Sequence, residues 1–192
     1  MKEEYASMIG EFLELRKTML DDLESINQRL IEDPLNECFI RVYVRTLYSF
    51  IETTCYIWKR AAYLKDRYDI ASGKIANSRL SEGDISMIFE ESFYVAENGK
   101  VKVRPNYIES TRNFRFSLRI FAETHGLNYA HIFNEKGWDA YREGLKIRNR
   151  LTHPKANADL IITDEEHEII YEVFDWFFGA IIFLGTDRGI IH

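Results

Sequence analysis

Hydrophobic residues recur at steps of three and four along most of the chain, which is the spacing of amphipathic helices. The pattern predicts helices over residues 3–32, 34–67, 82–92, 106–125, 135–152 and 164–184. Asp33-Pro34 separates the first two, because proline fits the first turn of a helix but not its interior, and Asp33 is the expected N-cap. Capping-box spacing marks two further helix starts, at Ser81 with Asp84 and at Thr163 with Glu166.

Between the third and fourth predicted helices the pattern changes to that of two short strands. Asn98-Gly99 lies between them, and this dipeptide between β-prone runs indicates a hairpin over residues 93–104. The expected fold is therefore all-α, an antiparallel bundle of about five to six helices with a small β-hairpin insertion. We expect a single domain over residues 1–192, with the hairpin inserted in it.

Composition and charge exclude several classes of function. The formal net charge of −6 means that any nucleic-acid site must come from a local basic patch. The most apolar run, 176–185, is shorter than the ~20 residues that cross a bilayer, so no membrane association and a cytoplasmic location are expected. No Cys/His cluster has zinc-ligand spacing and no glycine-rich phosphate loop is present, so neither a metal nor another cofactor is expected.

An arginine interrupts the apolar face of the predicted helix 135–152. Trp138, Tyr141, Leu145, Arg148 and Thr152 follow at steps of three and four and share that face. A guanidinium at a core position is costly unless it is paired. Two interpretations follow, an arginine in a salt bridge inside the bundle or an arginine of a functional site.

A histidine follows at the end of the same helix. Pro154 disfavours helical geometry at His153, so the helix is expected to end at Leu151 or Thr152 and the imidazole to leave the regular register. A histidine at a helix end is also an ordinary partner for the helix dipole. Its combination with Arg148 favours a functional interpretation.

The segment from Arg148 to His153 resembles the Arg-x(4–6)-His signature of the HEPN superfamily, the higher eukaryotes and prokaryotes nucleotide-binding domains. A polar residue, Asn149, follows the arginine, the motif ends a long helix, and one apolar helix comes after it. The resemblance covers roughly residues 34–185. It implies a metal-independent RNA endonuclease, of a toxin–antitoxin or antiviral defence system.

The resemblance also implies a role for each motif residue. His153 would be the general acid/base at the ribose 2′-hydroxyl or the leaving oxygen, since imidazoles ordinarily titrate near neutral pH. Arg148 would neutralise the phosphate, and Asn149 would orient the phosphate or the histidine. An acidic position on the second helix, Glu52, resembles the accessory acid of some HEPN families and could pair with Arg148; a solvent-exposed acid is the alternative.

Other cations surround the motif in the sequence. Arg142, Lys146, Arg150 and Lys155 form a local basic patch that suits an RNA backbone, although a solvated helix face is the alternative for Arg142 and Lys146. Lys155 also marks a departure. Toxins silenced by a nucleotidyltransferase antitoxin commonly have a tyrosine at this position, two residues after the histidine.

The resemblance implies a homodimer with a composite active site, and an antitoxin or defence-system partner. The predicted last helix is more apolar than one buried stripe requires, which fits either a dimer interface or a central place in the bundle. A non-catalytic HEPN module that binds nucleic acid, nucleotide or a protein partner is the second function class, with Arg148 in a structural ion pair.

Overall fold

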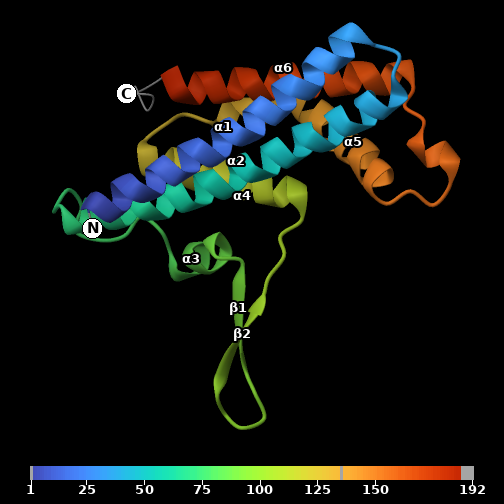
Figure 1. Ribbon diagram of the computed structural model, residues 1–192. Coiled ribbons are helices and arrows are strands. Elements are labelled where there is room, and N and C mark those ends of the chain that lie inside the picture. The colour runs from blue at the N-terminus through green and yellow to red at the C-terminus, as the bar shows by residue number, and fades with distance from the viewer. Residues whose placement is uncertain (1, 135, 187–192) are drawn as a thin grey trace. The chain divides into compact units, whose positions relative to one another are not determined.

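The computed structural model describes residues 2–134 and 136–186, with the side chains of residues 2–5, 134 and 181–186 left outside the description. It confirms the all-α fold with one small hairpin (Figure 1). The elements are α1 (Lys2–Glu32), α2 (Glu37–Ala71), α3 (Glu82–Ile88), β1 (Glu91–Val95), β2 (Val101–Pro105), α4 (Ser110–His125), the 3-10 helices η1 (Ala130–Asn134) and η2 (Asn157–Leu160), α5 (Lys136–Thr152) and α6 (Asp164–Thr186). No helix in the described part of the chain is both long and apolar enough to cross a membrane.

Local signals set several element boundaries as expected, while others differ by a few residues. Both capping boxes form, and Gly126 ends α4 in the left-handed conformation. The start of α2 was predicted wrongly. Asn36, and not Asp33, accepts hydrogen bonds from the first backbone N–H groups of the helix, at Cys38 and Phe39. The side-chain oxygen of Asn36 caps the helix, three residues later than expected, because Pro34 lies in a turn that precedes the helix.

The chain divides into two compact units. One contains residues up to Glu11 together with Cys55–Leu127, and the other contains Phe12–Thr54 and the chain from Asn128 onward. In the first unit, Ala62 of α2, Ile88 of α3, Ile120 of α4 and Leu80 of the segment before α3 form a buried core. The hairpin of this unit extends away from α3 and α4 (Figure 1).

The second unit holds the candidate motif. The Trp138 and Tyr141 rings of α5 lie against Trp176 of α6, with ring centroids 6.0 and 5.9 Å apart. Phe50 of α2 packs against Phe177 and Phe178 of α6. These aromatic contacts build a three-helix core on which the end of α5 is fixed.

The apolar face of α6 is thus used largely inside its own unit. Phe177 is fully buried, and Phe174 and Phe178 are partly buried. The other residues from which the sequence predicted a dimer interface, Ile181 to Leu184, have side chains outside the described residues. The homodimer stays a prediction.

Candidate functional site

One face of α2 meets α5 where the side chain of Tyr48 reaches the α5 backbone. Gly144 lies opposite the Tyr48 hydroxyl, and any Cβ atom at position 144 would overlap it. Tyr48 donates a hydrogen bond to the Tyr141 carbonyl oxygen at 3.0 Å, and the two rings stack with centroids 5.8 Å apart. Glycine here lets the α2 side chains reach the backbone of α5.

Arg148 lies beside this contact and is half-buried. Its guanidinium forms an ion pair with Glu52, donates to the Asn149 side-chain oxygen at 3.0 Å, and lies 6.0 Å from the centre of the Tyr48 ring. Only 18% of the Arg148 side chain is exposed, against 46% for Glu52. The predicted pairing of Glu52 with Arg148 is confirmed, and Glu52 is the partner that faces solvent.

Burial shifts the pKa values of two groups in this cluster. It lowers the pKa of the Arg148 guanidinium from its usual value and raises the pKa of the Tyr48 hydroxyl, which Arg148 partly opposes. Arginine stays charged even so, because its usual pKa lies far above neutrality. The result is a fixed positive charge beside a neutral phenol and a solvent-facing carboxylate.

His153 lies one residue beyond the end of α5, as the sequence predicted from Pro154. Its backbone N–H still donates to the Asn149 carbonyl oxygen at 3.0 Å, while its imidazole is exposed and forms no hydrogen bond or ion pair with the described residues. The following turn is ordered by Asp159, which accepts from the backbone N–H groups of Lys155 and Ala156. These two hydrogen bonds lower the pKa of Asp159.

Arg150, which the sequence predicted to contact RNA, is engaged in contacts within the protein. Its guanidinium binds both carboxylate oxygens of Glu166 at 2.7 Å and donates to the carbonyl oxygens of Ala158, Asp159 and Ile161. Both side chains of the pair are largely covered. Arg150 therefore ties α5 to η2 and to the start of α6.

The predicted basic patch is also less cationic than its sequence window suggested. Lys146 pairs with Glu143 at 2.7 Å, and Arg142 lies 3.5 Å from Asp139. The acids that pair with Arg148 and Arg150, Glu52 and Glu166, come from other helices and are distant from the patch in the sequence. Of the four patch residues and Arg148, Lys155 is the one whose side chain has no ion pair to a described residue.

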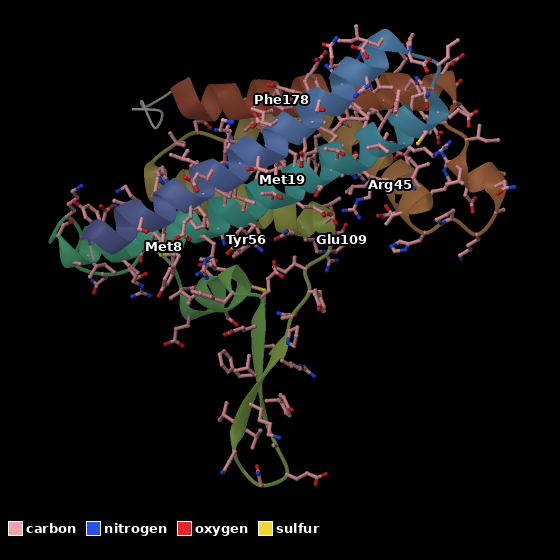
Figure 2. All side chains as sticks on the ribbon, viewed as in Figure 1. Met8, Met19, Arg45, Tyr56, Glu109 and Phe178 are labelled. Atoms are coloured by element: carbon pink, nitrogen blue, oxygen red, sulfur yellow. The ribbon has the colours of Figure 1, made fainter. Side chains whose placement is uncertain are left out.

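The structure adds two arginines of α2 that sequence reasoning missed. Arg45 donates to the Leu151 carbonyl oxygen at the end of α5 (Figure 2), and Arg41 donates to that of Leu160 at 3.3 Å. Arg41, Arg45, Tyr48 and Glu52 follow at steps of four and three, so they share one face of α2. That polar spacing was a usable signal, but nothing local showed that the face meets α5.

The cluster shows no sign of a metal site. No group of three or more His, Cys, Asp or Glu side chains within residues 2–134 and 136–186 is placed to hold a metal ion. A comparison of the chain with protein-family models, curated proteins and solved structures found no significant match.

Proposed function

We propose that this protein is a metal-independent RNA endonuclease of the HEPN type, acting as a toxin or an antiviral defence effector. The observation that carries the proposal is the end of α5. A half-buried, oriented guanidinium at Arg148 is followed, one residue past the helix end, by an exposed imidazole at His153. A fixed cation and a solvent-accessible acid/base are the two groups that cleavage of RNA through its own 2′-hydroxyl requires.

In this reaction the ribose 2′-oxygen attacks the adjacent phosphorus and the 5′-oxygen of the next nucleotide leaves. His153 takes the proton from the 2′-hydroxyl or delivers one to the leaving oxygen, and Arg148 neutralises the charge on the phosphate. Glu52 holds the guanidinium until the phosphate takes the place of its carboxylate. The products are a 2′,3′-cyclic phosphate and a 5′-hydroxyl, and DNA is not cut because it lacks the nucleophile.

The test is incubation of the purified protein with labelled single-stranded RNA in EDTA. We expect cleavage that leaves cyclic-phosphate ends, and no cleavage of DNA of the same sequence. Replacement of His153 or Arg148 by alanine is expected to lower the rate by roughly 100-fold or more, the usual effect of removing an acid/base or a charge-stabilising group. His167→Asn is the matched control, a histidine of α6 outside the cluster, and is expected to cleave like the wild type.

A second function has a specific observation in its favour. Arg148 already has a partner in Glu52, and three further cations of the patch pair with acids, which suits a non-catalytic HEPN module. RNA binding that depends on Arg148, without cleavage of any RNA, would replace the nuclease with this binding module. Cleavage that survives both alanine replacements would reject the assignment of the site.

A further inference from the structure

The β1–β2 hairpin has two chemically different faces. The strands pair antiparallel in a register that joins Phe93 with Val103 and Val95 with Val101, and all four of these apolar side chains are more than half exposed. Because cross-strand partners share a face and neighbours along a strand alternate, the opposite face is formed by a second set. That set is Ser92, Tyr94, Ala96, Lys100, Lys102 and Arg104.

The second set, here called the cationic face, carries three positive charges and no acid. Its cations occupy alternate positions from Lys100, directly before β2, to Arg104, so they are spaced ~6.6–6.8 Å apart along the extended chain. Arg104 donates to the Ser92 hydroxyl at 3.1 Å, and its guanidinium lies 5.9 Å from the centre of the Tyr94 ring. Lys100, Lys102 and Arg104 are exposed and form no ion pair with the residues that the structure describes.

The base of the hairpin is firmly held on the helices of its unit. Lys59 is buried in α2 and forms an ion pair with Glu90 at 2.5 Å, directly before β1. Glu90 has a φ of 54°, a conformation that non-glycine residues keep only where their surroundings hold it. Its carbonyl oxygen also accepts the backbone N–H of Asn106 at 2.7 Å, just after β2. Glu90 thereby holds both ends of the hairpin, the start of β1 and the chain just after β2.

We propose that the cationic face is an RNA-binding surface that holds single-stranded RNA, with phosphates on Lys100, Lys102 and Arg104 and a base on the Tyr94 ring. Cations at regular spacing beside an aromatic ring are what a sequence-tolerant single-strand site needs. The charge on this face is opposite to that of the chain as a whole, which is −6. The identity of the ligand rests on the proposed ribonuclease function, whose substrate this surface would collect.

The geometry favours RNA over an anionic membrane. A hairpin lying on a bilayer would bury its apolar face, and the three cations would then point away from the lipid headgroups. A polyanion on the cationic face meets all three cations at once. The apolar face plays no part in this contact.

The experiment measures the binding of a short labelled single-stranded RNA to the full chain carrying His153→Ala, which keeps the RNA intact. Lys100, Lys102 and Arg104 are replaced together by glutamine, and Kd is followed against salt concentration. We expect at least a ten-fold rise in Kd and a salt dependence shallower by about 2 in log–log slope, for three lost phosphate contacts. The matched control replaces Arg16, Lys17 and Arg29 of α1, which removes the same charge elsewhere and is expected to leave the slope unchanged.

Two further variants keep the test independent of folding. Tyr94→Ala is expected to weaken binding several-fold without a change in the salt slope, because it removes stacking and no charge. Lys59→Met releases the base of the hairpin and is expected to weaken binding while the circular dichroism spectrum stays helical. An unchanged Kd and slope in the glutamine variant would overturn the inference. So would a glutamine variant that loses binding to phosphatidylserine vesicles while its binding to RNA stays the same.

The two proposals fail separately. Wild-type protein that cuts no RNA, with the glutamine variant still binding RNA more weakly, would reject the nuclease and support the hairpin surface. Cleavage that depends on His153, with RNA binding unaffected by the glutamine variant, would reject the hairpin surface and support the nuclease.

Discussion

Arg148 and Arg150, two residues apart on α5, differ in how fully the protein itself binds their guanidinium groups. Arg148 has one ion-pair partner that is itself nearly half exposed, whereas Arg150 has two carboxylate bonds and three carbonyl acceptors. A bidentate pair that is partly covered from solvent contributes more to stability than an exposed one. Arg150 is therefore a structural residue, and Arg148 is the one with capacity for a ligand.

Replacing Arg150 by alanine is expected to lower the free energy of unfolding by roughly 2–3 kcal/mol, because Glu166 is left without its partner and the carbonyl groups without their donor. Urea denaturation measures this. Arg142→Ala is the control, since its exposed pair with Asp139 contributes less than about 1 kcal/mol. Equal losses in the two variants would show that the Arg150 contacts are of no special importance.

The close approach at Gly144 gives a second residue-scale prediction. Gly144→Ala is expected to lower the free energy of unfolding by roughly 1–3 kcal/mol through overpacking against Tyr48, although alanine is ordinarily the better helix former. Tyr48→Phe alone loses one hydrogen bond, about 1 kcal/mol. The double variant should lose less than the sum, because the overlapping hydroxyl is gone.

A double-mutant cycle in urea measures that coupling. Gly10→Ala is the control for helix propensity, since nothing lies within 4 Å of an added Cβ there, and it should be neutral or slightly stabilising. Strict additivity would show that the added methyl group is not overpacked against the Tyr48 hydroxyl.

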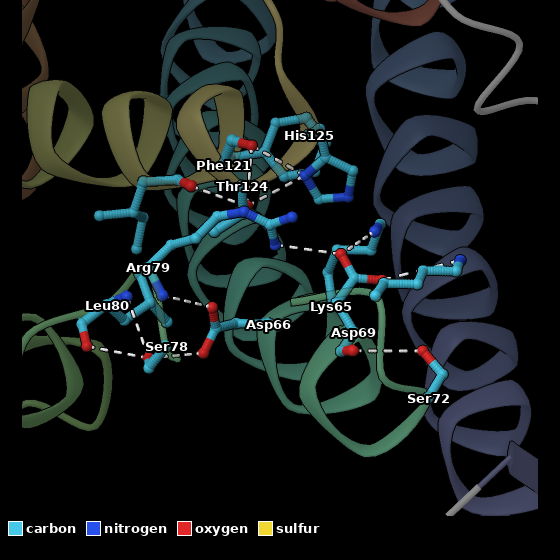
Figure 3. A network of polar contacts seen from close by, with 12 residues as sticks. Lys65, Asp66, Asp69, Ser72, Ser78, Arg79, Leu80, Phe121, Thr124 and His125 are labelled. Carbon is cyan, nitrogen blue, oxygen red and sulfur yellow. Dashed lines mark hydrogen bonds and ion pairs between the residues drawn. The ribbon is translucent and has the colours of Figure 1, made fainter. Parts of the chain in front are cut away.

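At the scale of elements, a polar network fixes the C-terminal end of α2 in the first unit (Figure 3). Asp66 accepts from the Arg79 backbone and the Ser78 hydroxyl, and Asp69 pairs with Lys65 and with Arg79 at 3.0 Å. Both aspartates are almost fully buried, so the network is costly to open.

A histidine of α4 beside this network predicts a pH dependence of stability. Burial lowers the pKa of His125 from its ordinary 6.5; its Nδ1 lies 2.8 Å from the Phe121 carbonyl oxygen, and the charges around it are Lys65, Arg79 and Asp69. The folded state thus keeps His125 neutral at pH values where the unfolded state already binds a proton. The contribution of His125 to the free energy of unfolding is therefore fully present above pH 6.5 and is lost as the pH falls below that value.

Urea unfolding at about pH 8 and about pH 5.5 measures this loss. We expect a smaller pH effect in His125→Gln than in the wild type, and His167→Asn serves as the control. The pKa of Asp69 is also lowered, where the ion pairs with Lys65 and Arg79 outweigh burial, so its contribution is lost only at more acidic pH. The same pH effect in all three proteins would exclude His125 as the cause.

The elements themselves were largely predictable because their signals are local. Capping boxes, the αL glycine after α4 and the Asn-Gly turn act within a few residues of each boundary. The hairpin loop is one residue longer than that dipeptide, since Gly99 donates to the Ala96 carbonyl oxygen and takes a positive φ that closes a three-residue loop. The helix predicted over residues 106–125 begins only at Ser110, and Tyr107, which lies before it, is 86% exposed.

At the scale of the whole molecule, the candidate site was only half predictable. Arg148, His153 and the pairing with Glu52 follow from spacing and resemblance. The pairing of Arg150 with Glu166 and the hydrogen bond from Arg45 to the end of α5 join residues that are 16 and 106 positions apart in the sequence. No local pattern encodes such contacts. A charge window along the sequence overstated the basic patch for the same reason.

The remaining prediction concerns two copies of the chain. Among the residues that the structure describes, the contacts of Arg148 and those of His153 share Asn149 alone. One imidazole cannot both take and deliver a proton in a single step. A homodimer that brings two motifs into one groove would supply the second imidazole. We therefore expect the active protein to be dimeric in a measurement of molar mass by light scattering.

Mixed dimers test whether the site is shared. Protein with His153→Ala on one copy and Arg148→Ala on the other, isolated through two different tags, is expected to regain part of the activity that each variant lacks alone. Each copy then supplies the group that the other has lost. A site complete within one copy would leave the mixed dimer as inactive as its parents, since neither copy keeps both residues. Dimers of wild type with the double variant are the control, because they contain one intact copy in either case.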